Sequence, residues 1–346
     1  MSSTFKLRIV LLYAPITVAT VFGFVASEII GHASVVLAGL GVVSYVFGLR
    51  HGLDADHIAA IDNTVRKLMQ EGKRPLTVGT WFSLGHSTIV VALIVALVFS
   101  TKAITRAIPT LQSFGAVLGT AVSGVFLWFI GLINVAIVFG IYRIYKEMRR
   151  GNLNSEQLDE MLNKRGFLNR YFSSLFGMIK EPWHIYPIGV LFGLGFDTAS
   201  EIALIAISVG VGVSASVPLW MILILPFMFT CGMVLVDTTD AITMLVAYDW
   251  AFFKPIRKIY YNLTITIISV LIAFLIGTVE VIQVLSSELG LVGQPWISLA
   301  HIDFETFGYI IIGMFVVAWI TSMAIYKIKR IDDDRLHPQK QQPVDT

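Results

Sequence analysis

The residues best suited to chemistry lie together in the sequence FGLRHGLDADHIAAIDN, at positions 47–63. Two imidazoles, His51 and His57, flank the carboxylates of Asp54 and Asp56. Neutral imidazole and carboxylate form a nitrogen and oxygen ligand set that suits borderline divalent metals such as nickel, cobalt, zinc, copper and iron. A calcium or magnesium site is built from oxygen and would not need two histidines. The stretch predicts a divalent transition-metal site, with a proton relay as the alternative.

Three other apolar segments also carry acidic or imidazole groups. These are His86 in WFSLGHSTIVV, Asp197 and Glu201 in LGFDTASEIAL, and Asp237 and Asp240 in GMVLVDTTDAITM. The acids of each pair are three or four residues apart, a spacing that places both on one face of a helix. Two of these groups also have a structural alternative: His86 would bond one helix to another, and Asp237 with Asp240 would hold their helix in place through a buried network.

The composition identifies the class of protein that surrounds these groups. Of 346 residues, 56% are hydrophobic and 14% are charged, whereas soluble domains carry about 25% charged residues. The chain is therefore expected to be a membrane protein in contact with a lipid bilayer, with no nucleic-acid partner. Its one cysteine, Cys231, excludes a disulfide framework, a cysteine-rich zinc site and an iron–sulfur cluster.

Eight apolar segments approach or exceed the length of about 20 residues that crosses a bilayer. They predict an all-α polytopic membrane protein with spans at about 9–30, 35–62, 77–100, 114–142, 185–212, 217–248, 259–286 and 306–326. All would belong to one transmembrane domain over residues 1–330, with a cytoplasmic connector at about 143–183. Residues 331–346 are polar and predict a disordered cytoplasmic tail.

Basic residues are distributed unevenly between the two sides of this domain. Nearly all of the 25 lysines and arginines fall in the N-terminal tail, the loops Arg66–Arg74, Arg143–Lys180 and 254–258, and the C-terminal tail. The opposite side has only Lys102 and Arg106, and Arg50 lies within a span. Because cytoplasmic loops carry the excess of positive charge, both termini are expected in the cytoplasm of a multi-pass plasma-membrane protein.

With this orientation, the ionisable groups of the second, third, fifth and sixth spans lie at overlapping depths, between the midplane and the cytoplasmic face. An ionised side chain at the bilayer centre costs about 2.5–3.5 kcal/mol on insertion scales, so such groups usually face a partner or a water-filled cavity. Apart from Glu28 near the outer end of the first span and Glu280 in the seventh, the acidic and imidazole groups are confined to these four spans, which predicts one shared site. Arg50 would pair with one of the acids or extend to the interface.

The second span presents a geometric problem. On a regular helix His51, Asp54 and His57 would cover an arc of about 120°, while Asp56 would point away from them. Either Asp56 supports the site from behind the ligands, or the helix opens near Gly52, as spans do where they line an ion site. A helix break near Gly52 is therefore the sharpest structural prediction.

The four segments together resemble the sequence blocks of the nickel/cobalt transporter family (NiCoT, the high-affinity nickel permeases). RHGLDADHI is similar to the family signature, which is a histidine, four residues and Asp-His, and the other three blocks follow in the same order. The resemblance implies a secondary permease that carries Ni2+ or Co2+ inward, with His51, Asp56 and His57 essential for metal recognition. The family often has alanine at the position of Gly52, which concerns the local backbone.

On this interpretation the metal is the cargo, and no resident cofactor or catalytic residue is expected. The metal-binding residues would be His51, Asp54, Asp56, His57 and His86. A second group would line the translocation path or support the ligands from behind: Arg50, Asp197, Glu201, Asp237 and Asp240. The sequence has no G-x-x-x-x-G-K-[ST] phosphate loop, so no ATPase is expected to drive transport. The membrane potential is the remaining energy source, together with ion gradients.

Three other interpretations stay open. Relatives in the wider superfamily export nickel and cobalt, so the direction of transport has an alternative. An intramembrane metal-dependent hydrolase is the alternative from another class, but the sequence lacks H-E-x-x-H and G-x-S-x-G and offers only Ser83 near His86. A proton-coupled transporter of another solute would use the acids as a relay. In addition, FGLRHGLDADHI and LFGLGFDTASEI share FGL and G-x-D, which is consistent with an inverted repeat.

Overall fold

In the computed structural model, all regular secondary structure among the described residues is helical. Those residues are 3–32, 34–99, 102–149, 179–194, 199–214, 218–251 and 255–291, with 293–296, 298, 302, 308–314, 316–317 and 320–321. The helices are α1 (Ser3–Gly31), α2 (Val35–His51), α3 (Ala55–Gln70), α4 (Val78–Phe99), α5 (Lys102–Arg149), η1 (Pro182–Ile185), α8 (Tyr186–Phe192), α9 (Ala199–Ser214), η2 (Leu219–Leu223), α10 (Ile224–Ala251) and α11 (Pro255–Glu288).

Five of these helices are long and apolar enough to cross a membrane, and there are six candidate spans if α2 and α3 count as one bent span. The five are α1, α4, α5, α10 and α11. The predicted fifth span is divided into α8 and α9, with residues 195–198 outside the described residues. Much of the predicted eighth span, most of the connector and the whole tail also lie outside them. The all-helical membrane class is thus confirmed, and the total of eight spans stays a prediction.

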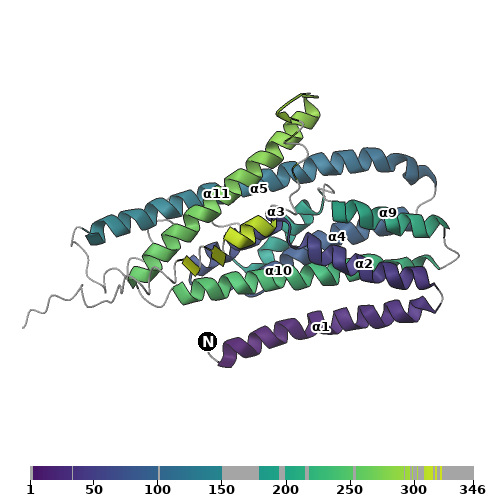
Figure 1. The fold of residues 1–346 in the computed structure, drawn as a ribbon, viewed down its shortest axis with the longest axis horizontal. Helices are drawn as coiled ribbons and strands as arrows, with labels where there is room; N and C mark the ends of the chain where they lie inside the picture. The colour runs from purple at the N-terminus through teal and green to yellow at the C-terminus, as the bar shows by residue number, and fades with distance from the viewer. Residues whose placement is uncertain are drawn as a thin grey trace, which may run out of the picture.

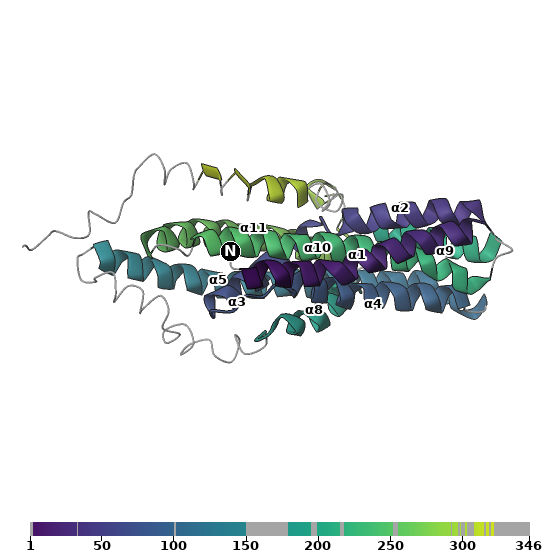
Figure 2. The ribbon, with the colours of Figure 1, turned by 90° about the horizontal axis from the view of Figure 1, so that it is seen from below.

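The helices that carry the predicted site form the centre of the bundle. Helix α10 packs against α2, α3 and α4, and α2 and α4 both contact α9. Helix α1 lies on one flank against α2 and α10, while α5 and α11 cross one another on the other flank (Figure 1). Figure 2 shows α8 beside α4. The outer helices thereby cover the central ones, as a buried polar site in a bilayer requires.

Glycines allow the central helices to approach closely. A Cβ atom at Gly48 of α2 would lie 2.0 Å from the carbonyl oxygen of Phe229 in α10, and one at Gly232 would lie 2.4 Å from the carbonyl oxygen of Tyr45. Small residues are typical of helix interfaces in membranes, because dispersion contacts replace the hydrophobic effect there. The contact fixes the height of α10 relative to the end of α2.

The predicted helix break is confirmed. Helix α2 ends at His51 and α3 begins at Ala55, with an angle of 55° between the two helices. Gly52 is still helical (φ −63°, ψ −9°), and the chain becomes extended at Asp54 (φ −63°, ψ 145°). Gly52 is required for space and not for its dihedral angles, since a Cβ there would lie 2.9 Å from Cβ of Val236.

The end of α3 differs from the sequence prediction. The predicted second span ended at residue 62 and placed Arg66 in a cytoplasmic loop, but α3 continues to Gln70 and Arg66 is buried. Its guanidinium donates to Asp62 (3.2 Å), to the hydroxyl of Thr266 (2.9 Å) and to Ser269. The prediction was wrong because a charged residue was taken to end the span, whereas a buried carboxylate and two hydroxyls on α11 satisfy the charge.

Candidate metal site

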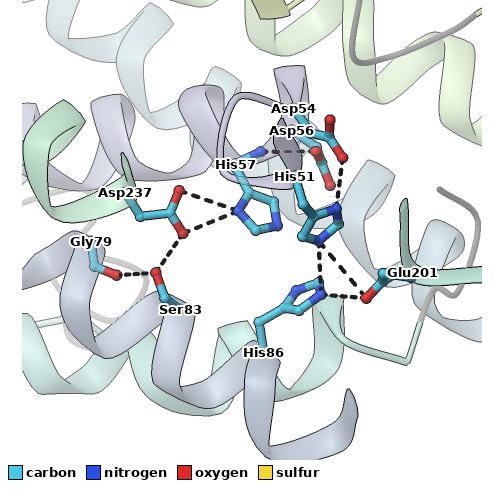
Figure 3. A network of polar contacts seen from close by, with 9 residues as sticks. All are labelled: His51, Asp54, Asp56, His57, Gly79, Ser83, His86, Glu201 and Asp237. Atoms are coloured by element: carbon cyan, nitrogen blue, oxygen red, sulfur yellow. Dashed lines mark hydrogen bonds and ion pairs between the residues drawn. The ribbon is translucent and has the colours of Figure 1, made fainter. Parts of the chain in front are cut away.

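Three imidazoles meet at the break between α2 and α3. His51 is the last residue of α2, His57 lies in the first turn of α3, and His86 lies near the middle of α4. All three are buried, and each offers a nitrogen within 4.8 Å of those offered by the other two. The break makes this possible, because it turns His57 back toward the end of the helix that carries His51 (Figure 3).

Glu201 extends from α9 into the same cluster. Its Oε1 lies 2.6 Å from Nε2 of His86 and 3.8 Å from Nε2 of His51, and the two Nε2 atoms are 3.0 Å apart. The carboxylate is buried. Two nitrogens and one oxygen from three helices therefore converge on one small volume. The sequence placed Glu201 only on the path or behind the ligands, and the geometry brings it into contact with two of the histidines.

Carboxylates hold two of the imidazoles from their far side. Oδ2 of Asp54 lies 2.9 Å from Nδ1 of His51, and Oδ2 of Asp237 lies 3.2 Å from Nδ1 of His57. Metal-binding histidines usually donate the proton of their second nitrogen in this way, which leaves the first nitrogen free to bind. Nε2 of His57 is buried and has no hydrogen-bond partner among the described residues. The hydrogen bond to Asp237 therefore directs Nε2 of His57 into the cluster, and the close approach of Asp54 places a negative charge behind His51.

Asp56 has a different position. Its Oδ1 accepts a hydrogen bond from the backbone N–H of the next residue, His57 (2.9 Å), and the side chain is only half-buried. Asp56 occupies the first turn of α3, where the positive end of the helix dipole favours a negative charge. The structure thus combines the two alternatives, since the helix breaks near Gly52 and Asp56 contacts the backbone of α3.

Asp237 is itself held by α4. The hydroxyl of Ser83 lies 2.5 Å from Oδ2 of Asp237 and 2.9 Å from the carbonyl oxygen of Gly79, and both side chains are buried. Figure 3 shows the resulting series from Gly79 through Ser83 and Asp237 to His57. From the sequence, Ser83 was considered only as a neighbour of His86 in the hydrolase alternative. The sequence signal is the spacing of four residues between Gly79 and Ser83, which puts a small residue and a hydroxyl on one face of the helix.

The remaining predicted site residues lie outside this cluster or outside the described residues. Asp240 is half-buried one turn further along α10, within electrostatic range of Asp62 and Asp237. Arg50 is exposed at the end of α2. Asp197 belongs to residues 195–198, outside the described residues.

Two aromatic rings close the cluster. Phe229 of α10 packs on His51 with ring centroids 5.4 Å apart, and Phe82 of α4 meets His57 edge-on at 4.7 Å. Both phenylalanines are buried. Apolar walls of this kind keep water away and lower the local dielectric, which strengthens every electrostatic interaction inside the site.

Comparison with known proteins gives one consistent result. The family described as high-affinity nickel-transport protein matches residues 37–325. The chain is 46% identical to the nickel transporter NixA of Staphylococcus aureus over 90% of this chain and 92% of that protein. It is 42% identical to a high-affinity nickel transport protein of Cupriavidus necator, over 96% of this chain and 95% of that one. The cobalt transport protein NhlF of Rhodococcus rhodochrous is 32% identical, over 85% and 84%. No solved structure matches the chain.

Proposed function

Because the chain belongs to the family of high-affinity nickel-transport proteins, a family of membrane transporters and not of enzymes, we propose that it is a secondary permease that carries Ni2+ or Co2+ into the cell across the plasma membrane. Curated relatives are named for transport of nickel or of cobalt. The observation that carries the proposal is the buried cluster of three imidazoles around Glu201. A site of nitrogen donors with one carboxylate, closed off from water, suits a borderline divalent metal.

The Nε2 atoms of His51 and His86 are close enough to bind one ion together. Metal–nitrogen bonds of about 2.1 Å at right angles place two nitrogens about 3.0 Å apart, and the two Nε2 atoms of His51 and His86 are 3.0 Å apart. Right angles between ligands are typical of tetragonal and octahedral coordination, and tetragonal nitrogen and oxygen sites are typical of Ni2+. We assign His51, His57, His86 and Glu201 as the ligands of the transported ion.

The other acids have supporting roles in this proposal. Asp54 and Asp237 orient His51 and His57 through Nδ1, and Asp56 stabilises the first turn of α3. Asp240, Asp197 and Arg50 belong to the path that the ion follows to and from the cluster. Asp240 continues the line of carboxylates from Asp237 along α10.

The energy for uptake comes from ion gradients or from the membrane potential. A potential of 100 mV supplies about 2.3 kcal/mol per charge, so a divalent cation gains about 4.6 kcal/mol on entry. That free energy corresponds to an accumulation of more than about a thousandfold. Entry driven by the potential therefore needs no ATPase partner.

We further propose eight spans with both termini in the cytoplasm. The excess of lysine and arginine on one side supports this orientation, and the five or six candidate spans in the described residues agree with the predicted positions. The predicted fifth span would consist of α8 and α9, and α9 has Glu201 in its first turn as α3 has His57 in its first turn.

Uptake of radioactive 63Ni2+ into cells that lack their own nickel transporters tests the proposal. Expression of the chain should raise cellular nickel, and His57→Ala should reduce uptake to the background of empty cells because it removes a ligand. His32→Ala is the matched control, since His32 is an exposed histidine beyond the end of α1, and it should transport normally. Normal uptake by His57→Ala would contradict the proposal, and a fall in cellular nickel on expression would show export.

A further inference from the structure

We propose that Ser83 is a positioning residue for metal binding: through Asp237 it fixes the orientation and the tautomer of His57, so that Nε2 of this histidine is free to bind the ion. The inference rests on the proposed function and assigns a residue on α4 to the metal-binding machinery. Ser83 does not contact the ion in this assignment. It acts through one carboxylate and one imidazole.

The three side chains form a continuous series of buried contacts. Ser83, Asp237 and His57 come from α4, α10 and α3, and all three are buried. The hydroxyl oxygen of Ser83 is 2.5 Å from Oδ2 of Asp237 and 2.9 Å from the carbonyl oxygen of Gly79, so the nearer acceptor for its one proton is Asp237. The same Oδ2 is 3.2 Å from Nδ1 of His57. Hydrogen bonds between an O–H and a carboxylate of about 2.5–2.7 Å are strong, because the acceptor carries the charge.

The position of protons in this series follows from the donors that are present. An ionised carboxylate only accepts, so with Asp237 ionised Nδ1 of His57 carries the proton of this hydrogen bond. A neutral imidazole with a proton on Nδ1 has a lone pair on Nε2, and that atom has no hydrogen-bond partner among the described residues. The opposite tautomer would place a proton where the metal binds. A group that holds Asp237 against Nδ1 of His57 therefore also keeps Nε2 unprotonated, so that it can bind the ion.

Ser83 is well placed to hold Asp237 because backbone packing fixes its height. Gly79 lies one turn before Ser83, and a Cβ atom at Gly79 would be 1.9 Å from the carbonyl oxygen of Asp237. The hydroxyl of Thr80 also bonds that of Thr238, at 2.7 Å. Helices α4 and α10 are thus in register beside this pair. Without the hydroxyl of Ser83, the carboxylate of Asp237 would lose its hydrogen-bond donor on α4 and could rotate away from Nδ1.

The experiment compares two serines of one helix in the purified full-length protein. Ser83→Ala removes the hydroxyl that bonds Asp237. Ser87→Ala is the matched control, since Ser87 is buried one turn further along α4 and its hydroxyl has no partner among the described residues. Ser83→Thr keeps a hydroxyl and serves as the rescue variant. Affinity for Ni2+ is measured by calorimetry, and the tautomer of His57 is read from 15N chemical shifts of labelled histidine in the metal-free protein.

Ser83→Ala should weaken Ni2+ binding about 10-fold to 100-fold, as loss of groups behind metal ligands typically does. The same variant should show His57 as a mixture of tautomers, while Ser87→Ala and Ser83→Thr should keep wild-type affinity and the Nδ1-protonated form. Equal affinity and equal tautomers in Ser83→Ala and Ser87→Ala would overturn the inference. Wild-type Ni2+ binding by His57→Ala would instead overturn the proposed function, so the two failures are distinguishable.

Discussion

At the scale of single residues, each imidazole of the cluster has a different set of partners. His51 and His57 present Nδ1 to Asp54 and Asp237, whereas His86 has its Nε2 beside Glu201 and its Nδ1 without a hydrogen-bond partner among the described residues. Glu201 therefore lies within 4 Å of the Nε2 atoms of both His51 and His86. Its negative charge also offsets part of the charge of a divalent ion in a site closed to water.

Replacing Glu201 by glutamine tests this role, because the amide keeps the size of the side chain and removes its charge. Glu201→Gln should weaken Ni2+ binding at least about tenfold, the lower end of the range seen even for groups behind metal ligands. Calorimetry on the purified protein measures the effect. Glu28→Gln is the control, since Glu28 is exposed on α1, and equal affinities in the two variants would exclude Glu201 as a ligand.

At the scale of elements, α9 shares features with α3, the second helix of the bent pair. Helix α2 ends at the site with His51, and α9 begins there with Glu201 as its third residue, just as His57 is the third residue of α3. Helices α3 and α9 begin with similar sequences, Ala-Asp-His-Ile and Ala-Ser-Glu-Ile. Helices α2 and α9 also contact one another. These features strengthen the prediction of an inverted repeat in which each half contributes one broken span.

The close contact of α4 with α10 is a second feature at this scale, and Gly79→Ala tests it. The added Cβ would collide with the backbone of Asp237, and overpacking of this kind typically costs about 1–3 kcal/mol of stability. The variant should therefore melt at a lower temperature in detergent and should bind Ni2+ more weakly. Gly39→Ala on α2 provides the comparison, because a Cβ there has no atom within 4 Å among the described residues, and equal melting temperatures would contradict the packing.

The ion pair between Asp62 and Arg66 joins α3 to α11 through Ser269, whose hydroxyl lies 2.7 Å from Oδ2 of Asp62. Removing one partner of a buried pair leaves the other charge uncompensated and typically costs about 3–5 kcal/mol. Arg66→Met alone should thus be strongly destabilised. The double variant Asp62→Leu with Arg66→Met should recover much of that loss in thermal unfolding, and a double variant less stable than Arg66→Met would argue against the pair.

At the scale of the whole molecule, charge distribution and hydropathy were enough to predict a helical membrane protein, and the spacing of His51, Asp56 and His57 was enough to predict a break in the second span. Sequence could not show that Glu201 contacts two histidines, since that depends on how α9 packs against α2 and α4. It also could not show that Arg66 is buried, because its partners Thr266 and Ser269 are about 200 positions away. Contacts between distant helices are set by packing, which periodicity does not encode.

The predicted orientation leads to a labelling pattern for the whole molecule. The one native cysteine, Cys231, is buried, so single cysteines can be introduced elsewhere with little background. Arg74→Cys lies after α3 and Ser287→Cys near the end of α11, both at exposed positions. A membrane-impermeant maleimide added to intact cells should label Ser287→Cys and should label Arg74→Cys only after the membrane is opened. The reverse pattern would place the termini outside.

X-ray absorption at the nickel edge of the purified protein loaded with one equivalent of Ni2+ tests the central proposal most directly, because it reports the atoms bound to the ion. Three imidazoles and one carboxylate should give nitrogen and oxygen neighbours at about 2.1 Å, with outer-shell scattering from three imidazole rings. His57→Ala should lose one ring from that pattern. A nickel ion bound only by oxygen, or a spectrum unchanged in His57→Ala, would contradict transport through the histidine cluster.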